Sequence, residues 1–370
     1  MRGILPILVL AAACLGMWFL PMPRLLSDSP NAAFSTRATV VEVDDSGVER
    51  HGLIQFGTQR LTVELPDGTR RAAVNELRAQ MELDKTFAVG DTALVVSGGG
   101  DGDVLVAREH WRFGWLAVLF GAFCLLLVAF GGWTGMKALF SFVFSCFAIC
   151  KLLIPLCLRG WDADWTSFLC VSVLTAVIMY LVAGWTRKGA AAFFGAMLGV
   201  VASLALADFF SGVLHVNGAT MPFAQTLVYS GFENLDLADI FVGSVILASS
   251  GAVMDLAMDI AAGVREIHRH TPNLPRLELF WSGLRIGRSV VGTMTTTLLL
   301  AYSGGYLTLL MVFATQGTRL TDVLSSTLVS AELVKTLVGS FGLVLVAPFT
   351  ALVSAWMFGK EKVEDAPAAG

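Results

Sequence analysis

Residues 114–132 read GWLAVLFGAFCLLLVAFGG, a stretch with no charged side chain that is long enough to cross the hydrocarbon core of a bilayer as one helix. Further apolar blocks of similar length follow at residues 136–157, 165–184, 190–214, 237–261, 287–313 and 337–358. The composition agrees, because 55% of the 370 residues are hydrophobic and only 15% are charged, against about 25% in ordinary globular proteins. The sequence therefore predicts an α-helical polytopic membrane protein.

An eighth apolar segment lies at the N-terminus. Residues 1–20 contain Arg2 and then an uncharged run to Leu20, which predicts a signal anchor that forms the first transmembrane helix. Cleavage and lipidation at Cys14 is the alternative, because AAAC is near a lipoprotein processing pattern. The apolar run continues past Cys14, and this favours the anchor and a total of about eight spans.

Residues 21–113 differ from the rest of the chain, and they predict a small domain of β-strands. Short alternating runs such as ATVVEV at 38–43 and LTVEL at 61–65 have the period of half-buried strands. The turn signal Pro66-Asp67-Gly68 follows the second run. About five strands in this length indicate an all-β barrel or sandwich of OB or SH3 type.

The charges of the short loops predict one orientation in the membrane. Basic residues concentrate in Arg187-Lys188, in 265–288 and in the tail 359–370, while the acids of WDAD at 161–164 and ENLD at 233–236 lie in the opposite loops. The positive-inside rule then places both termini in the cytoplasm and the β domain outside. The sequence has no basic stripe with aromatic residues, so we expect no nucleic-acid partner. The expected partners are the lipid bilayer, a small solute or ion, and a second copy in a homo-oligomer.

Charged side chains within apolar blocks are the best indicator of function, because each costs about 2.5–3.5 kcal/mol to insert. An inner layer combines Asp255 and Asp259, which share one helix face, with Arg288 and a threonine ladder. We expect this cluster, through Asp255, Asp259, Arg288, Thr293, Thr296 and Thr297, to line an ion or solute path. The alternative is a structural Asp–Arg pair beside hydroxyls that bond to their own helix.

A second, outer layer is formed by Lys151, Asp208, Glu332 and Lys335, and it is a candidate gate. Lys151 can instead extend to the lipid headgroups, and Glu332 and Lys335 can instead belong to an amphipathic surface helix.

Glycine and proline are predicted to interrupt several spans, which would expose backbone polar groups near cavities. Close packing of helices is the alternative for each glycine. The positions are Gly251, Gly304-Gly305, Gly339-Ser340, Gly342 and Pro348.

Three segments resemble the YibE/F-like family of bacterial multi-pass membrane proteins: GAVMDLAM at 251–258, LELFWSGL at 277–284 and IGRSVVGTMTTTLLLAY at 286–302. The resemblance implies the bacterial plasma membrane and a strand-rich domain before seven helices, and it names no substrate. The family usually has an Asp after the arginine and an Asn among the threonines, where this chain has Ser289 and Thr296. A carboxylate relocated to Asp259 and paired with Arg288 is our hypothesis for this difference.

Two classes of function remain. The first is a secondary or channel-like permease or exporter that uses the inner layer, and the alternative is a sensor or scaffold whose outer β domain binds a ligand or partner. No P-loop, zinc or nucleophile-elbow motif is present, so we expect no cofactor and no ATP-driven pump. An intramembrane enzyme is a third class, but Asp255 and Asp259 lie on one helix with no evident facing acid, so we expect no enzyme activity.

Overall fold

The computed structural model describes residue 16 and residues 35–81, 83–97 and 104–359. It forms two compact units, which divide between Phe130 and Gly131. Apart from Gly16, the anchor predicted over residues 1–20 lies outside the described residues, and so does the tail after Gly359.

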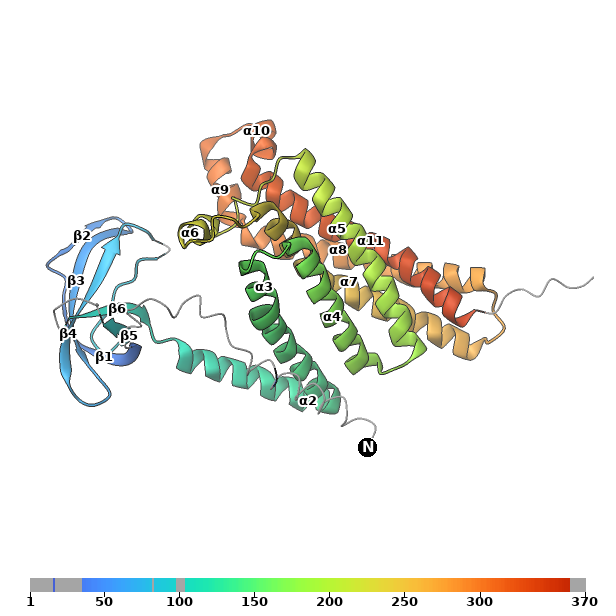
Figure 1. The fold of residues 1–370 in the computed structure, drawn as a ribbon, viewed down its shortest axis with the longest axis horizontal. Helices are drawn as coiled ribbons and strands as arrows, with labels where there is room; N and C mark the ends of the chain where they lie inside the picture. The colour runs from blue at the N-terminus through green and yellow to red at the C-terminus, as the bar shows by residue number, and fades with distance from the viewer. Residues whose placement is uncertain (1–15, 17–34, 82, 98–103, 360–370) are drawn as a thin grey trace, which may run out of the picture. The chain divides into compact units, whose positions relative to one another are not determined.

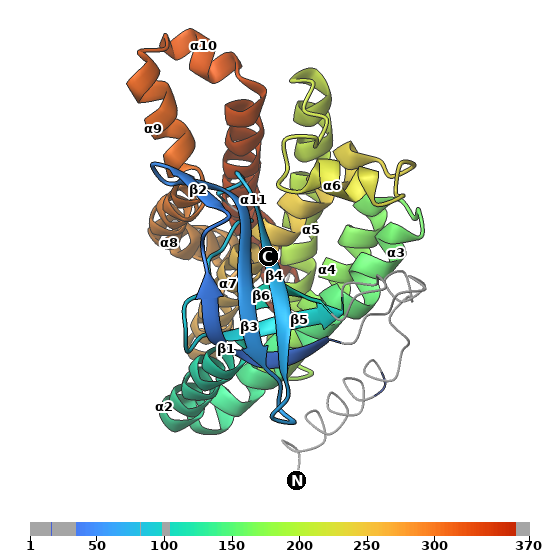
Figure 2. The same cartoon turned by 90° about the vertical axis from the view of Figure 1, so that its left-hand side faces the viewer.

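The first unit contains a closed β-barrel (Figure 2). Its hydrogen-bonded strand order is β1-β5-β6-β4-β3-β2, and β1 also pairs with β3, so five strands close the barrel while β2 extends β3 as a hairpin. The pairing of β4 with β6 is parallel and the others are antiparallel. A barrel of five strands confirms the predicted domain. The strands are β1 (Ser35–Asp44), β2 (Val48–His51), β3 (Ile54–Glu64), β4 (Arg70–Arg78), β5 (Thr92–Ser97) and β6 (Leu105–His110).

Alternating apolar residues fill the barrel, as their period predicts. Val40 of β1 and Leu61 and Val63 of β3 are among the buried core residues. The pairing of β1 with β3 shifts between Val40 and Glu42, as at a β-bulge. This shift explains why Val43, and not Glu42, contacts the core at the end of β1.

A buried amide network attaches the segment between β4 and β5 to the barrel. The Gln59 side chain donates to Phe87 O at 3.0 Å and to Asp45 Oδ1 at 2.8 Å, and its Oε1 accepts from Phe87 N at 3.0 Å. Asn75 Nδ2 donates to Gln59 Oε1 and to Lys85 O. Because Gln59 and Asn75 are each 1% exposed, these bonds replace water that neither side chain can reach.

The predicted turn at Pro66-Asp67-Gly68 is confirmed between β3 and β4. Gly68 has φ +80°, and Asp67 Oδ1 accepts from both Thr69 N and Thr69 Oγ1, at 2.9 and 2.6 Å. These two donors hold the pKa of the Asp67 carboxyl below its usual range.

The remaining described residues are mostly helical, and Figure 1 shows α4, α5, α7 and α11 side by side. The helices are α2 (Phe113–Ala148), the π-helix η1 (Ile149–Leu153), α3 (Ile154–Leu158), α4 (Ala163–Ala183), α5 (Arg187–Val213), α6 (Ala224–Tyr229), α7 (Leu237–His270), α8 (Arg276–Gly305), α9 (Leu307–Gln316), α10 (Leu320–Ser325) and α11 (Thr327–Phe358).

Five helical elements in the described residues are long and apolar enough to cross a membrane, or six if α8 and α9 are one span bent by 66°. This number is smaller than the number of apolar segments predicted after residue 113. The reason is that one helical element, Phe113–Leu158, contains both predicted segments 114–132 and 136–157. Gly132 interrupts it with non-helical angles, φ 51° and ψ −126°. Its 46 residues would span about 69 Å as a straight helix, against a hydrocarbon core of about 30 Å.

Most of the predicted helix interruptions are wrong. Helix α7 continues through Gly251, and α11 continues through Gly339, Gly342 and Pro348. Several glycines instead permit close packing: a Cβ on Gly342 would collide with Ser203 of α5. The predicted interruption at Gly304-Gly305 is present, because α8 ends there before the bend.

Candidate functional site

Helix α7 is the centre of the helical unit and carries both carboxylates of the predicted inner layer. It packs against α4, α5, α8 and α11, and residues such as Leu256 and Ile260 are fully buried. A narrow stripe with Gly251, Asp255 and Asp259 remains exposed. Because these residues recur every four positions, the two carboxylates follow one another along the open side of α7.

The open stripe of α7 lies beside α8. Ile286 of α8 is packed so closely on Gly263 of α7 that a Cβ there would come within 2.5 Å of Ile286 Cδ1. Thr293 and Thr297 follow Ile286 by about two and three helical turns, so they lie on the same side of α8. The contact between Gly287 and Ile260 shows that the helices run antiparallel. Thr293 is therefore level with Asp255, and Thr297 is level with Gly251.

The threonine hydroxyls bond to their own helix, which was the alternative interpretation of this ladder. Thr293 donates to Val290 O at 2.9 Å, Thr296 to Gly292 O at 3.0 Å, and Thr297 to Thr293 O at 2.9 Å. All three threonines are exposed. Since a donating hydroxyl oxygen keeps its lone pairs, each can still coordinate a cation or bond to water.

Arg288 does not join this cluster. It follows Ile286 by two residues, about 200° around the helix, and so it projects away from α7. Among the described residues, no ion pair within 4.0 Å connects Arg288 to Asp255 or Asp259. The expected Asp–Arg pair, including the relocated pair with Asp259, is therefore not formed in this structure.

Two residues of the predicted outer layer do meet. Lys335 Nζ donates to Glu332 Oε1 at 2.9 Å, and it lies 5.5 Å from the ring centroid of Phe241 of α7. Both belong to the first turns of α11, so their assignment to a separate surface helix is wrong. The Lys335 side chain is 19% exposed and the Glu332 side chain 27%, so the ion pair is partly buried.

The other two outer residues are not part of that ion pair. Lys151 lies in the π-helix η1, a rare geometry that often accompanies functional sites, and Asp208 is exposed on α5.

Comparison with known proteins identifies the family. A model described as YibE/F-like protein matches residues 119–360, more than half of the chain. The chain belongs to the YibE/F-like family. No curated protein and no solved structure matches it. The match includes the whole of α7, α8 and α11, and with them the acidic stripe and the threonines.

One end of the helical unit of this YibE/F-like protein is acidic, and it contains the acids of the two loops at 161–164 and 233–236. Asp162, Asp236 and Asp239 line a cavity of about 110 Å³ where α4 and α7 begin. Asp164 lies within range of their charges and of Asp208, and its Oδ1 is buried with no hydrogen-bond partner. Within the described part of the chain, no three of these groups are arranged to hold a metal ion.

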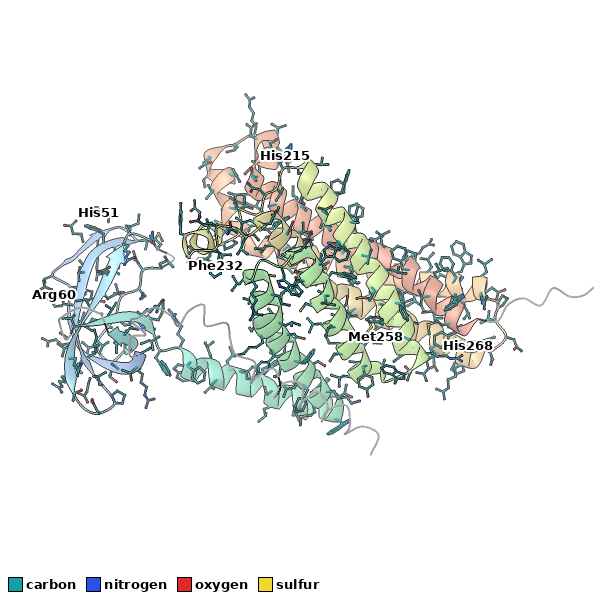
Figure 3. The ribbon with its side chains drawn as sticks, viewed as in Figure 1. His51, Arg60, His215, Phe232, Met258 and His268 are labelled. Carbon is teal, nitrogen blue, oxygen red and sulfur yellow. The ribbon has the colours of Figure 1, made fainter. Side chains whose placement is uncertain are left out.

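The other end of the same helices is basic. Arg276 at the start of α8 donates from Nε to Gly359 O beyond α11, at 3.2 Å, and α5 begins at this end with Arg187. His268, labelled in Figure 3, lies near this end, while His215 follows the last turn of α5 at the opposite end. The basic loops at Arg187-Lys188 and 265–288, which were predicted to share one side of the membrane, therefore lie at one end of the unit. The apolar helices and the family indicate a membrane protein.

Proposed function

We propose that this YibE/F-like protein is a multi-pass permease or exporter of the bacterial plasma membrane. It moves a small ion or solute, by secondary transport or as a channel, along the open side of α7. The basic end of the helical unit faces the cytoplasm, and Gly132 divides Phe113–Leu158 into two spans. With the N-terminal anchor, the chain then has about eight spans and cytoplasmic termini.

The exposed acidic stripe of α7 is the observation that supports this proposal. Asp255 lies 18 residues after Leu237, about 27 Å along the helix, a length shorter than the hydrocarbon core of about 30 Å. Exposure of the Asp255 carboxylate to lipid would cost up to about 2.5–3.5 kcal/mol, so a hydrated path beside it is favoured. The threonine oxygens of α8 and the carboxylates suit a cation better than an anion.

A comparison of ion and small-metabolite contents tests the proposal. Host cells would lack the protein, carry it, or carry Asp255→Asn at the same membrane level, since this change removes the charge and keeps the shape. Asp322→Asn on the exposed helix α10 is the matched control. We expect a content difference that the intact protein and Asp322→Asn produce and Asp255→Asn abolishes. Equal contents in all four strains across a broad panel would refute transport.

The β-barrel favours a second function, that of a sensor or scaffold. Its β3 strand exposes Ile54 and Phe56, and Leu53 before it is 82% exposed, an apolar edge that a ligand or partner could cover. Deletion of residues 34–107 separates the two functions. A permease would keep part of its transport after this deletion, whereas a sensor would lose all activity.

A further inference from the structure

A cavity of about 520 Å³ opens at the basic end of the helical unit, outside the acidic stripe. It lies between the end of α4, the start of α5 and Met357 of α11. Phe193, Phe194 and Met357 line its apolar body, and no acidic side chain is among the described residues around it. Its size is in the range of ligand pockets, but this lining offers little to hold a polar solute.

The mouth of the cavity is positively charged. Arg187 lines it, Lys188 follows in the same first turn of α5, and the positive end of the α5 dipole points the same way. No carboxylate in the described part of the chain lies within 4.0 Å of either cation. Two unneutralised cations therefore stand above an apolar cavity.

Two aromatic side chains indicate the level of the cavity mouth in the membrane. Trp185 is 92% exposed, and its ring lies 5.8 Å from that of Tyr180 in an edge arrangement. Tryptophan and tyrosine prefer the level of the lipid headgroups, where one end of the ring is wet and the other apolar. The cations and the cavity thus meet where a phospholipid changes from headgroup to acyl chain.

We propose that this cavity binds one anionic phospholipid, with an acyl chain against Phe193, Phe194 and Met357 and its phosphate at Arg187 and Lys188. Basic pockets between transmembrane helices on the cytoplasmic side are suited to anionic headgroups, and the cytoplasmic leaflet is the more negative one. A zwitterionic lipid fits the same cavity and lacks the net charge. The proposal requires membrane insertion and does not depend on transport.

Native mass spectrometry of the full-length protein, titrated with lipid in detergent, tests the proposal. We expect one saturable site for phosphatidylglycerol and weaker binding of phosphatidylethanolamine. Removal of both charges in Arg187→Ala/Lys188→Ala weakens phosphatidylglycerol binding about 25-fold, since each cation contributes about fivefold. The same variant weakens phosphatidylethanolamine binding less, because the ammonium group of that lipid offsets the attraction of its phosphate to the two cations.

Three further variants separate charge, cavity and folding. Arg187→Lys keeps the charge and is expected to keep binding, while Ala190→Phe fills the cavity and is expected to weaken both lipids. Arg265→Ala/Arg269→Ala removes two exposed cations from the end of α7 and is expected to change nothing. Equal affinity for the two lipids, or wild-type binding by Arg187→Ala/Lys188→Ala or by Ala190→Phe, would overturn the proposal. Competition by inorganic phosphate as strong as that by the lipid would also overturn it, because the site would then be an anion site without an acyl chain.

Discussion

The contact between α5 and α11 predicts that one added methyl group, in Gly195→Ala, destabilises the helical unit. A Cβ on Gly195 would lie 2.7 Å from both Cα and Cβ of Thr350, where ordinary contacts are 3.4–4 Å. Since one of these atoms belongs to the backbone of α11, rotation of a side chain cannot relieve the collision. The two helices must therefore separate by about 0.7 Å or more.

The change in unfolding free energy of Gly195→Ala is the sum of two opposing contributions. Overpacking of this kind costs about 1–3 kcal/mol. Replacement of a helical glycine by alanine contributes about 1 kcal/mol in the stabilising direction. Gly251→Ala in α7 has only this stabilising contribution and no overpacking, because nothing lies within 4 Å of a Cβ there. We expect Gly195→Ala to be about 1–3 kcal/mol less stable than Gly251→Ala.

Reversible unfolding in mixed micelles with increasing mole fraction of dodecyl sulfate, followed by far-UV circular dichroism, measures this difference. The comparison of two Gly→Ala variants in one protein removes most of the propensity and detergent effects. Equal midpoints, or a Gly195→Ala variant more stable than the Gly251→Ala variant, would show that α5 and α11 are not packed as described.

Two further predictions concern the barrel and the outer ion pair. Gln59→Leu keeps the size of the side chain but leaves the Phe87 amide and carbonyl without their partner. We therefore expect the barrel to lose about 2–4 kcal/mol of stability and residues 79–91 to be cleaved faster in limited proteolysis. The half-buried Gln55 of the same strand is the control, and Gln55→Leu should leave cleavage unchanged. In a double-mutant cycle of Glu332→Gln and Lys335→Met, measured by the same micelle unfolding, we expect a coupling free energy of about 1–3 kcal/mol, and a value near zero would exclude a stabilising ion pair.

The carboxylate stripe could be predicted from the sequence, whereas its partners could not. The four-residue spacing of Asp255 and Asp259 defines one face of any α-helix, and α7 has that face. Whether Arg288 meets them depends on how α8 is rotated about its own axis. The contacts of Gly263 and Gly287 decide that rotation, and they place Arg288 on the far side.

Contacts between residues far apart in the chain explain two features that the sequence predicts only in part or not at all. Asp164 of α4 and Asp239 of α7 share one acidic end because the two helices start side by side, with Ala163 O beside Gly243. The lipid-sized cavity likewise needs α11 to end beside the loop between α4 and α5.

The sequence by itself determined the apolar segments, the strand-rich domain with its turn at Asp67, and the side of the membrane on which each short loop is expected. These properties depend on local composition and period, which each segment carries without its neighbours. The tertiary structure alone decided the closure of the barrel through β1 and β3, the continuity of α11 through its glycines, and the separation of Arg288 from Asp255. Each of these depends on which surfaces pack together, and packing contacts between distant segments leave no periodic signal in the chain.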